Sequence, residues 1–524
     1  MTQDSRAPQE NADGRRSGKL RVGWVGPLLG LASAAVALAV AELIAPFTGA
    51  RSAPIVAVGG VVVDAVPGPV KNFAVSTFGT HDKTALLIGT TILLALFAAG
   101  IGALAVRDMR LGLAGIGLFG LVGIVAAATR PNAGPGAVFP SLLGAAAGAV
   151  TMLGLLRWGP TPSRRRDLEE AARRRFLLAA GGSLGGAAIV GLLGHQVGAR
   201  RNVSAAREAV TLPTPSSPAS ALPGEADLRL PDLAPFVTPN ESFYRIDTAL
   251  AIPQVDPNSW QLRIKGKVRN PMTLTFAQLL ARPTMERYVT LACVSNEVGD
   301  SLISNAKWLG VSLRDLLAEA GPLPGADQVI GRAVDGFTVG APTEVLMDGR
   351  DAMLAFGMNG VPLPVEHGFP VRMVVPGLYG YVSATKWLAE LELSSFADFS
   401  AYWVPRGWSA QAPIKTESRI DTPRAGSSPR RGRVTVAGVA WAQHRGISKV
   451  EVRVDNGAWN TATLAAVPSV DTWRQWSFDW DATPGQHQLT VRATDNSGAT
   501  QTEQEAPPDP DGATGWHRIS VNVT

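Results

Sequence analysis

The sequence predicts a multi-domain chain: an N-terminal α-helical membrane region of five helices, an α+β domain and a C-terminal antiparallel β-sandwich. Three observations support this fold class. Long, uncharged, apolar runs fill the N-terminal third, short β-like and helix-like runs mix in the middle, and apolar and polar residues alternate near the C-terminus. A chain of 524 residues is long enough for several such domains.

The membrane region is predicted from apolar runs that contain no charged residue. Each has about the length needed to cross a hydrocarbon core of ~30 Å at 1.5 Å per residue, and their glycine and alanine content suits close helix packing in lipid. Five such runs argue against the alternative, buried helices of a soluble protein. We therefore expect a cytoplasmic tail at residues 1–21 and a transmembrane region at residues 22–196. The runs are Val22–Ala41, Thr84–Val106, Leu111–Thr129, Pro131–Leu156 and Phe176–Gly194.

Basic residues predict the orientation of these helices. Arginines and lysines gather before the first run, between the second and third, and between the fourth and fifth, whereas the loops at 51–83 and 130–134 hold fewer. Cytoplasmic loops carry the excess of positive charge. With an odd number of spans, everything after residue 196 is expected on the extracytoplasmic side of the cell membrane.

The fifth run begins RRRFLLAAGG, Arg173 to Gly182. Paired arginines before a moderately apolar stretch resemble a twin-arginine export signal, which carries domains that are already folded. Anchoring by positive charge on the cytoplasmic side would also place arginines here. The sequence leaves both interpretations open.

Three further segments follow the membrane region. Residues 197–230 are rich in Pro, Ser and Ala and are expected to form an unstructured linker. Residues 231–420 mix β-like runs (WQLRIKG, FPVRMVV) with helix-like runs (FAQLLARP, VSLRDLLAEA), which predicts an α+β domain. Residues 425–524 alternate apolar and polar residues between Gly, Asn, Asp and Pro turns, which predicts an antiparallel β-sandwich.

Composition excludes several classes of site. A single cysteine, Cys293, rules out intramolecular disulfides and multi-cysteine zinc or iron–sulfur sites. The six histidines show no HxxxH or HxH spacing, so a zinc site built from histidines is not expected. The net charge of +5 comes with arginines beside apolar runs, which indicates membrane orientation and not a nucleic-acid partner.

Two stretches of the α+β domain carry residues suited to chemistry. In TLACVSNEVGD, Thr290 to Asp300, the thiolate of Cys293 is a soft ligand for a transition metal, although a lone cysteine is often only a small buried apolar residue. The second stretch, LPVEHGFPVRMVVPGLYGYVSATKW, gathers His367, Arg372 and Lys386 with glycines that allow close backbone approach. Arginine binds phosphate bidentately and lysine adds a point charge, although each cation alone could be a solvated surface charge.

The soluble part of the chain resembles the sulfite oxidase family of molybdopterin enzymes, over about residues 235–520. Four stretches carry the resemblance. FYRIDTALAIPQVDPNSWQLRIKGKV is similar to the family's leading segment, TLACVSN to its cysteine segment, NAKWLGVSLRDLL to the helix after it, and LPVEHGFPVRMVVPGLYG…KWL to its HGxPxR…PGxxG…KWL block. The last hundred residues resemble the family's immunoglobulin-like dimerisation domain.

This resemblance implies a molybdenum–molybdopterin cofactor, with Cys293 as the metal ligand beside the dithiolene sulfurs of the pterin. Ser295 and Asn296 would belong to the cofactor loop. His367, Gly368, Arg372 and Lys386 would hold the pterin and its phosphate. The remaining implied site residues are Tyr244 and Arg245, where the leading segment approaches the cofactor, and Tyr402 as a catalytic candidate.

The sequence departs from the family pattern where substrate selectivity is expected. Animal and plant sulfite oxidases carry RNH in the leading segment, whereas Ile246, Asp247 and Thr248 stand here. SNEVG replaces the arginine-bearing GNRR after the cysteine, which lowers the positive charge for an anionic substrate. The tyrosine of the DYKGF stretch aligns with Pro405, and Tyr402 lies nearby.

The sequence therefore predicts a membrane-anchored molybdopterin-dependent oxidoreductase that transfers an oxygen atom to or from a small substrate, as a sulfite oxidase does. Because the chain has no fused cytochrome b5 segment and no CxxCH haem motif, we expect an external electron carrier or a quinone as redox partner. Membrane lipid and a homodimer are further expected partners. The alternatives are a methionine sulfoxide reductase of the cell envelope and, in another class, a non-catalytic membrane-anchored binding protein.

Overall fold

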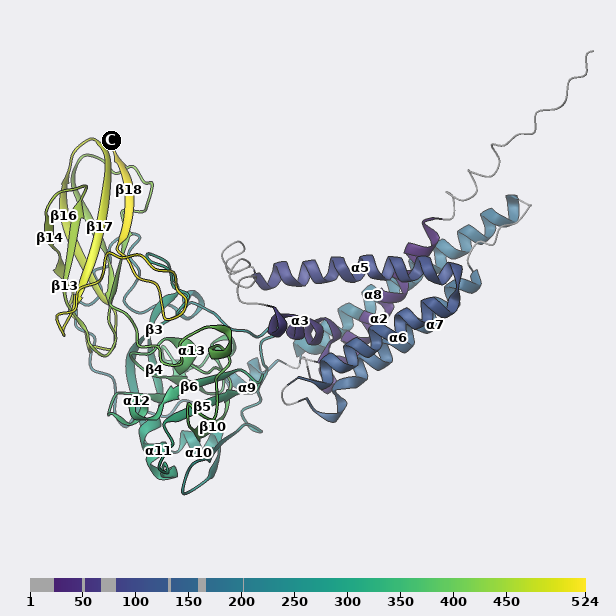
Figure 1. The fold of residues 1–524 in the computed structure, drawn as a ribbon, viewed down its shortest axis with the longest axis horizontal. Coiled ribbons are helices and arrows are strands. Elements are labelled where there is room, and N and C mark those ends of the chain that lie inside the picture. Colours follow the sequence, from purple (N-terminus) through teal and green to yellow (C-terminus); the bar gives the residue numbers. More distant parts are fainter. Residues whose placement is uncertain (1–22, 50–51, 67–81, 131–132, 159–165, 201) are drawn as a thin grey trace, which may run out of the picture. The chain divides into compact units, whose positions relative to one another are not determined.

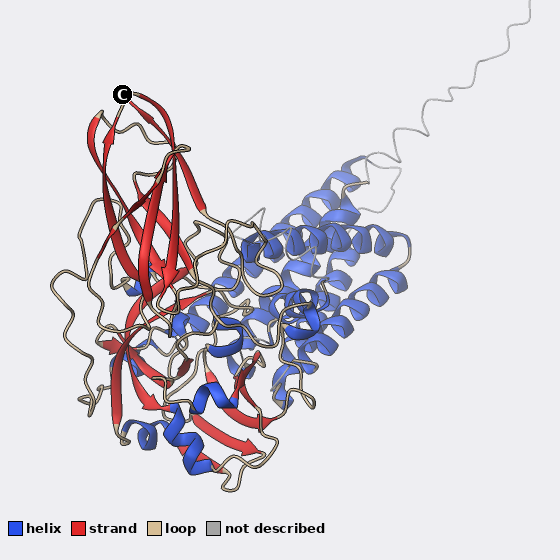
Figure 2. Cartoon of the chain, turned by 60° about the vertical axis from the view of Figure 1, so that its left-hand side comes forward, coloured by secondary structure: helices blue, strands red, loops and turns tan. Residues whose placement is uncertain are grey.

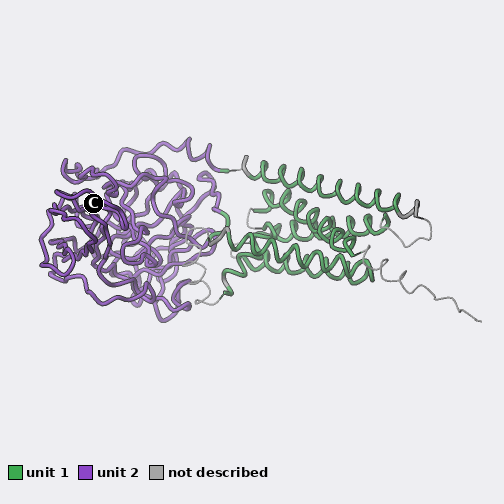
Figure 3. Tube along the Cα trace, turned by 90° about the horizontal axis from the view of Figure 1, so that it is seen from above, with its two compact units in different colours: residues 1–202, 249–251 green, residues 203–248, 252–524 purple. Residues whose placement is uncertain are grey.

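The structure, a computed structural model, describes residues 23–49, 52–66, 82–130, 133–158, 166–200 and 202–524. The chain divides into two compact units (Figure 3). Unit 1 comprises residues 1–202 and 249–251, and unit 2 comprises residues 203–248 and 252–524. The predicted tail at residues 1–21 lies outside the described residues.

Unit 1 is built from helices (Figure 1). Five of them are long and apolar enough to cross a membrane, which confirms the predicted α-helical region. The fifth is longer than its apolar run, because the flanking Arg, Glu, Ala and Leu residues are also good helix formers. The helices are α2 (Val25–Thr48), α3 (Pro54–Ala65), α5 (Asp82–Arg107), α6 (Met109–Ala128), α7 (Phe139–Trp158) and α8 (Arg166–Arg200), with the 3-10 turn η3 (Pro135–Val138).

Glycines set how closely these helices pack. A Cβ atom at Gly30 of α2 would stand 1.8 Å from the carbonyl oxygen of Ala98 in α5, and one at Gly102 of α5 would stand 2.0 Å from the carbonyl oxygen of Gly26. No side chain fits at such distances, so the two backbones approach each other only because glycine occupies these positions. The small residues that the sequence places in its apolar runs therefore form the helix contacts.

The N-terminal part of unit 2 is the predicted α+β domain (Figures 1 and 2). One mixed sheet has the strand order β2-β1-β10-β5-β6, in which only β1 and β10 pair in parallel; the second has the order β3-β4-β7-β8, with β9 paired to β7. The strands are β1 (Gln261–Gly266), β2 (Met272–Thr275), β3 (Thr284–Ala292), β4 (Ile303–Ser312), β5 (Gln328–Ala333), β6 (Thr338–Pro342), β7 (Met353–Met358), β8 (Val361–Pro362), β9 (Arg372–Val374) and β10 (Leu388–Ser394).

Short helices connect these strands. In one of them, α11, the hydroxyl of Ser312 caps the first turn by accepting from the backbone N–H of Asp315, and Gly321, with φ 68°, ends the helix. The short helices and 3-10 turns, α11 included, are α9 (Ser204–Glu208), η4 (Asn240–Ser242), α10 (Phe276–Leu280), α11 (Leu313–Ala320), α12 (Thr343–Met347), η5 (Val365–His367), α13 (Gly380–Ser383) and η6 (Val404–Arg406).

Two segments differ from the expectations drawn from sequence. Residues 305–312, taken as part of a helix, belong to strand β4, because pairing with β3 and β7 overrides the weak local preference of NAKWLGVS. Residues 203–230, expected to be an unstructured linker, lie against the domain. Ser217 pairs with the edge of β3 at Met285, and the guanidinium of Arg207 donates to the carbonyl oxygens of Pro362 and Leu363. The segment thus covers part of an otherwise exposed sheet edge.

The C-terminal part of unit 2 is the predicted sandwich of two antiparallel sheets, with strand orders β11-β12-β16-β15 and β14-β13-β17-β18. Its core lies between the sheets and includes Val436, Trp476 and Leu489, all of them fully buried. The strands are β11 (Glu417–Thr422), β12 (Gly432–Trp441), β13 (Ile447–Val454), β14 (Trp459–Thr461), β15 (Thr463–Leu464), β16 (Arg474–Ala482), β17 (Gly485–Asp495) and β18 (His517–Val523).

Glu417, at the start of β11, is a buried carboxyl with a predictable pH effect. Its Oε1 atom has no hydrogen-bond partner among the described residues, and burial raises its pKa to about 8. The proton held by the folded state therefore stabilises the protein fully below pH 4.5, and this contribution is lost as the pH rises through 8. We expect Glu417→Gln to raise the melting temperature at pH 9 by on the order of 5 °C, with little effect at pH 5.

Calorimetry of the variant at both pH values tests this expectation. Glu503→Gln, a substitution in an exposed carboxylate of the same domain, should show no such dependence on pH. An equal shift of the Glu417 variant at pH 5 and pH 9 would mean that its carboxyl is not protonated in the folded protein.

Candidate cofactor site

Cys293 lies directly after strand β3, where the chain leaves the sheet and turns back towards β4. Its backbone N–H donates to the carbonyl oxygen of Leu302 at 2.9 Å, and its own carbonyl accepts from the N–H of Asn296 at 3.1 Å. The side chain is 9% exposed. Burial raises the pKa of the thiol, while the backbone N–H and the hydroxyl of Ser295 act in the opposite direction as donors to the sulfur.

Cys293 lies on the wall of a cavity. Residues from widely separated segments border it: the leading segment, the cysteine loop, the β5–β6 hairpin, the HGFPVR…KW block and the stretch around residue 405. The residues that line it include Phe243, Tyr244, Asp247, Cys293, Ser295, Asp335, Phe337, His367, Arg372, Tyr381, Lys386, Trp403 and Trp408.

His367 ends the 3-10 turn η5 and contributes a neutral imidazole to this cavity. Its Nε2 lies 2.9 Å from the carbonyl oxygen of Asn240; because that oxygen can only accept, Nε2 carries the proton. Burial, aided by the positive charges of Arg372 and Lys386, lowers the pKa of His367 to about 4. The ring is therefore uncharged at neutral pH and can bind a ligand through hydrogen bonds.

Gly368 brings the cations of this block together. Its φ of 112° lies in the left-handed region, and a Cβ atom there would stand 3.0 Å from the Cα of Lys386 and 3.2 Å from the Cβ of Arg372. A side chain at this position would push apart the strand that carries Arg372 and the segment that carries Lys386. The glycine therefore supports the site without bordering the cavity.

Arg372 is a buried cation without a carboxylate partner in the described part of the chain. Its guanidinium donates only to backbone carbonyls, those of His367 at 3.2 Å and Met373 at 3.4 Å, and it stacks over Trp308 with 5.0 Å to the ring centroid. The residue is 5% exposed, and burial lowers its pKa to about 10. A buried, unpaired guanidinium is costly unless an anion such as a phosphate binds there.

Lys386, by contrast, has a counter-ion. Its ammonium lies 2.7 Å from the Oδ2 atom of Asp247, which also accepts from Arg245 at 2.9 Å. Burial lowers the pKa of Lys386 to about 8, although the Asp247 charge opposes this change. The ammonium also lies 4.8 Å from the centroid of the Trp387 ring. Asp247 therefore neutralises much of the positive charge on this side of the cavity.

The structure brings together six of the site residues proposed from sequence. Cys293, Tyr244, Ser295, His367, Arg372 and Lys386 all border the cavity. Three others do not border it. Gly368 permits the close approach described above, the Oδ1 atom of Asn296 accepts from the backbone N–H of Leu302 at 2.8 Å, and Arg245 is held by Asp247.

Tyr402, the expected catalytic residue, does not border the cavity. Its ring packs against Phe337 with 5.4 Å between centroids, and the guanidinium of Arg406 covers its face at 3.8 Å. The neighbouring Trp403 and Trp408 lie on the wall instead. Tyr402 thus contacts the lining residue Phe337 without bordering the cavity itself, and its catalytic role stays a prediction from the sequence.

Sequence reasoning missed several lining residues. Asp335 and Phe337 come from the β5–β6 hairpin, Tyr381 from the start of α13, and Trp403 and Trp408 from the loop after β10. Tyr381 lies in the HGFPVR…KW block, and Trp403 and Trp408 lie beside Tyr402 and Pro405, in the stretch compared with the family's DYKGF. No local signal marks Asp335 and Phe337, which the β5–β6 hairpin brings to the cavity.

The residues present fit a molybdenum–molybdopterin cofactor. The cavity offers one soft thiol with two donors aimed at its sulfur, an unpaired guanidinium that requires an anion, and a neutral imidazole for hydrogen bonding. The described residues include no cluster of three or more His, Cys, Asp or Glu side chains that could hold a metal ion. A metal at Cys293 would therefore depend on ligands supplied by a cofactor.

Comparisons with known proteins support a molybdopterin cofactor. Residues 249–403 match the family described as "Oxidoreductase molybdopterin binding domain", and residues 417–491 match "Bacterial Ig domain". Sulfite oxidase of Gallus gallus is 30% identical over 321 residues, which cover 52% of this chain and 69% of that protein. Mitochondrial sulfite oxidase of Mus musculus is 30% identical over 340 residues, which cover 55% of this chain and 62% of the mouse protein, less than two thirds of its length.

Among solved structures, the sulfane dehydrogenase SoxCD from Paracoccus pantotrophus matches with a TM-score of 0.48 and 25% identity, over 56% of this chain and 84% of that one.

The fold and the matched domains define a molybdopterin-binding oxidoreductase with a C-terminal immunoglobulin-like domain. The chain belongs to the sulfite oxidase family of molybdenum-dependent oxidoreductases. The molybdopterin-binding domain and the sulfite oxidase relatives imply a molybdenum–molybdopterin cofactor, as the resemblance predicted.

Proposed function

We propose that this protein is a membrane-anchored oxidoreductase that catalyses two-electron oxygen-atom transfer on a small substrate at the outer face of the membrane, as a sulfite oxidase does. The observation that carries this proposal is the joint presence, in one cavity, of the chain's single thiol and a buried, unpaired guanidinium. A protein that only binds a partner through its sandwich needs neither group, and an unpaired buried charge would destabilise it.

The proposed roles follow from the contacts. Cys293 would ligate the metal, and the donors of Ser295 would stabilise its thiolate. Arg372 would bind the phosphate of the cofactor bidentately, since only its Nε and Nη1 donors engage the backbone. His367 and Tyr244 would contact the pterin. When bound, the cofactor would supply the two-electron redox chemistry, while the protein orients it and excludes water.

The ion pair between Lys386 and Asp247 affects the charge of the substrate that the cavity would bind. Among the described lining residues, Arg372 is the only cation without a carboxylate partner, and the phosphate would occupy it. Asp247 pairs with Lys386, and Asp335 adds a second carboxylate to the wall. Little positive charge therefore remains for an anion such as sulfite, and the aromatic rings of Tyr381, Trp403 and Trp408 suit an apolar group. These observations favour the second candidate, reduction of an uncharged sulfoxide such as oxidised methionine.

The membrane placement rests on the five long apolar helices and on the arginine-rich segments between them. Electrons would pass to or from an external carrier or a quinone. Unit 1 contains an apolar cavity among α2, α5, α6 and α7, bordered by residues such as Ala37, Ile101, Phe119 and Met152, which offers space for an isoprenoid chain. A homodimer through the sandwich is proposed on the resemblance alone.

Metal analysis and two assays test the proposal. The full chain, purified from a host that makes the cofactor, should contain about one molybdenum per chain, since one thiol serves one metal centre. It should then either oxidise sulfite or reduce methionine sulfoxide with an artificial electron carrier. A purified chain without molybdenum would refute the proposed function, whereas activity on only one compound would decide between the two candidates.

A further inference from the structure

The segment that carries Cys293, residues 290–302, is bonded on both sides by the C-terminal sandwich. The cysteine side chain lies in the cavity of the α+β domain, but residues more than a hundred positions later in the chain contact the backbone before and after it. We call residues 290–302 the cysteine segment. Its contacts indicate that the sandwich has a role in the site itself.

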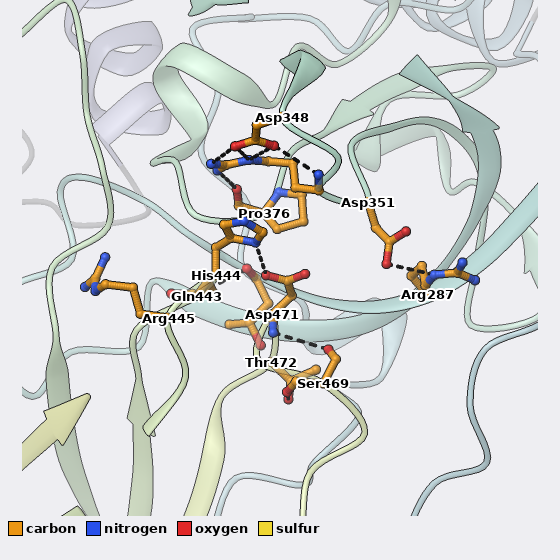
Figure 4. Close-up of polar contacts among 12 residues, drawn as sticks. Arg287, Asp348, Asp351, Pro376, Gln443, His444, Arg445, Ser469, Asp471 and Thr472 are labelled. Carbon is orange, nitrogen blue, oxygen red and sulfur yellow. Dashed lines mark hydrogen bonds and ion pairs between the residues drawn. The ribbon is translucent and has the colours of Figure 1, made fainter. Parts of the chain in front are cut away.

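On the N-terminal side, Thr290 is fully buried and bonded to three residues of the sandwich. Its N–H donates to the carbonyl of Asp471 at 3.0 Å, its hydroxyl accepts from the N–H of Trp473 at 2.8 Å, and its carbonyl accepts from the Gln443 amide at 3.2 Å. These bonds occupy the free edge of β3 next to Cys293. Figure 4 shows Asp471 and Gln443 on two neighbouring loops, with Asp471 bonded to His444 at 3.2 Å.

The loops in Figure 4 also contact the rest of the α+β domain. His444 approaches the turn at Gly377, where a Cβ atom would stand 3.0 Å from the Cβ of His444. Arg350, held by Asp348, donates to the carbonyl of Pro376 at 2.6 Å in the same turn. The loops of the sandwich therefore contact both β3 and the turn at residues 376–377.

On the C-terminal side, Arg419 of strand β11 reaches the carbonyl of Asp300. Its Nη1 donates to that oxygen at 2.6 Å, while its Nε donates to Asp421 at 2.6 Å. The arginine is 9% exposed. Gly299 packs directly on His517 of β18, since a Cβ atom there would stand 2.3 Å from the imidazole Cδ2. The far end of the cysteine segment is thus held by a charged donor and by close packing.

A displacement of Asp300 would be transmitted to Cys293 through a few backbone and side-chain hydrogen bonds. Leu302, two residues after Asp300, accepts from the N–H of Cys293 at 2.9 Å and donates from its own N–H to the Oδ1 atom of Asn296 at 2.8 Å. The N–H of Asn296 in turn donates to the carbonyl of Cys293 at 3.1 Å. These hydrogen bonds close the cysteine segment into a loop. A displacement of Asp300 at one end therefore also displaces Cys293 at the other.

We propose that Arg419 is a positioning residue of the metal site: through the carbonyl of Asp300 it sets the orientation of the Cys293 sulfur. This inference rests on the proposed role of Cys293 as the metal ligand. A backbone carbonyl does not require a charged donor, and a buried arginine is a costly way to join two domains unless the loop must be held in one position. The sandwich then has a second role beside any role in dimerisation.

The test replaces Arg419 without leaving a buried charge unpaired. The double variant Arg419→Met/Asp421→Asn removes the bond to Asp300, and an asparagine at 421 can still accept from the N–H of Ala234, as Asp421 does at 3.0 Å. Asp421→Asn alone is the companion variant. Arg433→Met is the matched control, because Arg433 is exposed and pairs with Asp479 on the surface of the same sandwich.

The first measurement is the alkylation rate of Cys293 by iodoacetamide in the full chain without cofactor. Because Cys293 is the only cysteine, the reaction reports one site. We expect the double variant to react about 10-fold faster than wild type, since a loosened loop exposes the thiol more often, and the control to react at the wild-type rate. This measurement does not depend on molybdenum, so it remains informative even if the proposed function fails.

The second measurement uses the enzyme with its cofactor. We expect altered g values of the Mo(V) electron paramagnetic resonance signal, and a kcat reduced about 10- to 100-fold with little change in KM, as for other groups that orient metal ligands. Unchanged thiol reactivity together with an unchanged spectrum would overturn the proposal. A wild-type protein without molybdenum would instead refute the proposed function alone.

A further variant keeps the test decisive if the double variant does not fold. Arg419→Lys retains the pairing with Asp421, but a single ammonium on a shorter side chain cannot reproduce both bonds of the guanidinium. We expect intermediate thiol reactivity and an intermediate spectrum. Full wild-type behaviour of this variant would show that the bond to Asp300 has no influence on Cys293.

Discussion

Cys293→Ala should abolish turnover while leaving the fold intact. The side chain is small and its backbone bonds do not involve the sulfur, so the loss of one buried atom is expected to cost only about 1 kcal/mol of stability. Loss of groups that merely orient metal ligands costs 10–100-fold in activity or affinity. Removing the proposed ligand itself should therefore reduce kcat by more than about 100-fold, measured with the substrate found by the two assays.

Ser301→Ala is the matched control for this experiment. Ser301 lies in the same loop, and among the described residues its hydroxyl hydrogen-bonds only to the carboxylate of Asp300, at 3.3 Å. The control should keep both metal and activity. Full retention of molybdenum and activity in Cys293→Ala would remove the thiol from the mechanism and return Cys293 to the role of a buried apolar residue.

Arg372→Met should have opposite effects in the two states of the protein. Without cofactor, the variant should be more stable than wild type, because it removes a buried guanidinium that has no carboxylate partner in the described residues. With cofactor, the lost phosphate contact should reduce the fraction of chains that retain molybdenum by at least 10-fold, since a charge-assisted bidentate contact contributes about 1.5–3 kcal/mol. Thermal unfolding and metal analysis measure the two effects.

Arg332→Met provides the comparison. Arg332 is partly exposed and paired with Glu392 at 2.7 Å, so its loss should slightly destabilise the protein and leave cofactor content unchanged. If Arg372→Met instead lowered the stability of the cofactor-free protein, the guanidinium would be a structural group. If it retained molybdenum fully, the anion site would have to lie elsewhere in the cavity.

The sequence predicts those parts of the site whose residues lie in short local motifs. The cysteine segment carries Cys293 and Ser295. The HGFPVR…KW block carries His367, Arg372 and Lys386. Their side chains do border one cavity. Each motif brings its side chains to the cavity through a local turn. One turn has Gly368 at positive φ, and the other is closed by the bonds between Cys293, Asn296 and Leu302.

The sequence does not reveal the direction of a side chain where that direction depends on distant packing. Tyr402 and Trp403 are adjacent and both aromatic, yet the turn at η6 places only Trp403 on the cavity wall. The linker was misjudged for a similar reason. Its Pro- and Ser-rich composition is typical of an unstructured segment, but the free edge of β3 provides backbone partners at Ser217 that composition does not reveal.

By itself, the sequence determined the class of each part of the chain. Long uncharged runs form helices, alternating apolar and polar residues form a sandwich, and the α+β domain holds both the single cysteine and a block of cationic residues. These are local properties, set by hydrophobic periodicity and residue chemistry. Tertiary structure alone decided that Asp247 neutralises Lys386, that Arg372 has no carboxylate partner in the part of the chain that the structure describes, and that Arg419 reaches the cysteine segment. Charge balance and loop position depend on which groups the fold brings within a few ångströms, and such distances have no signature in residue spacing.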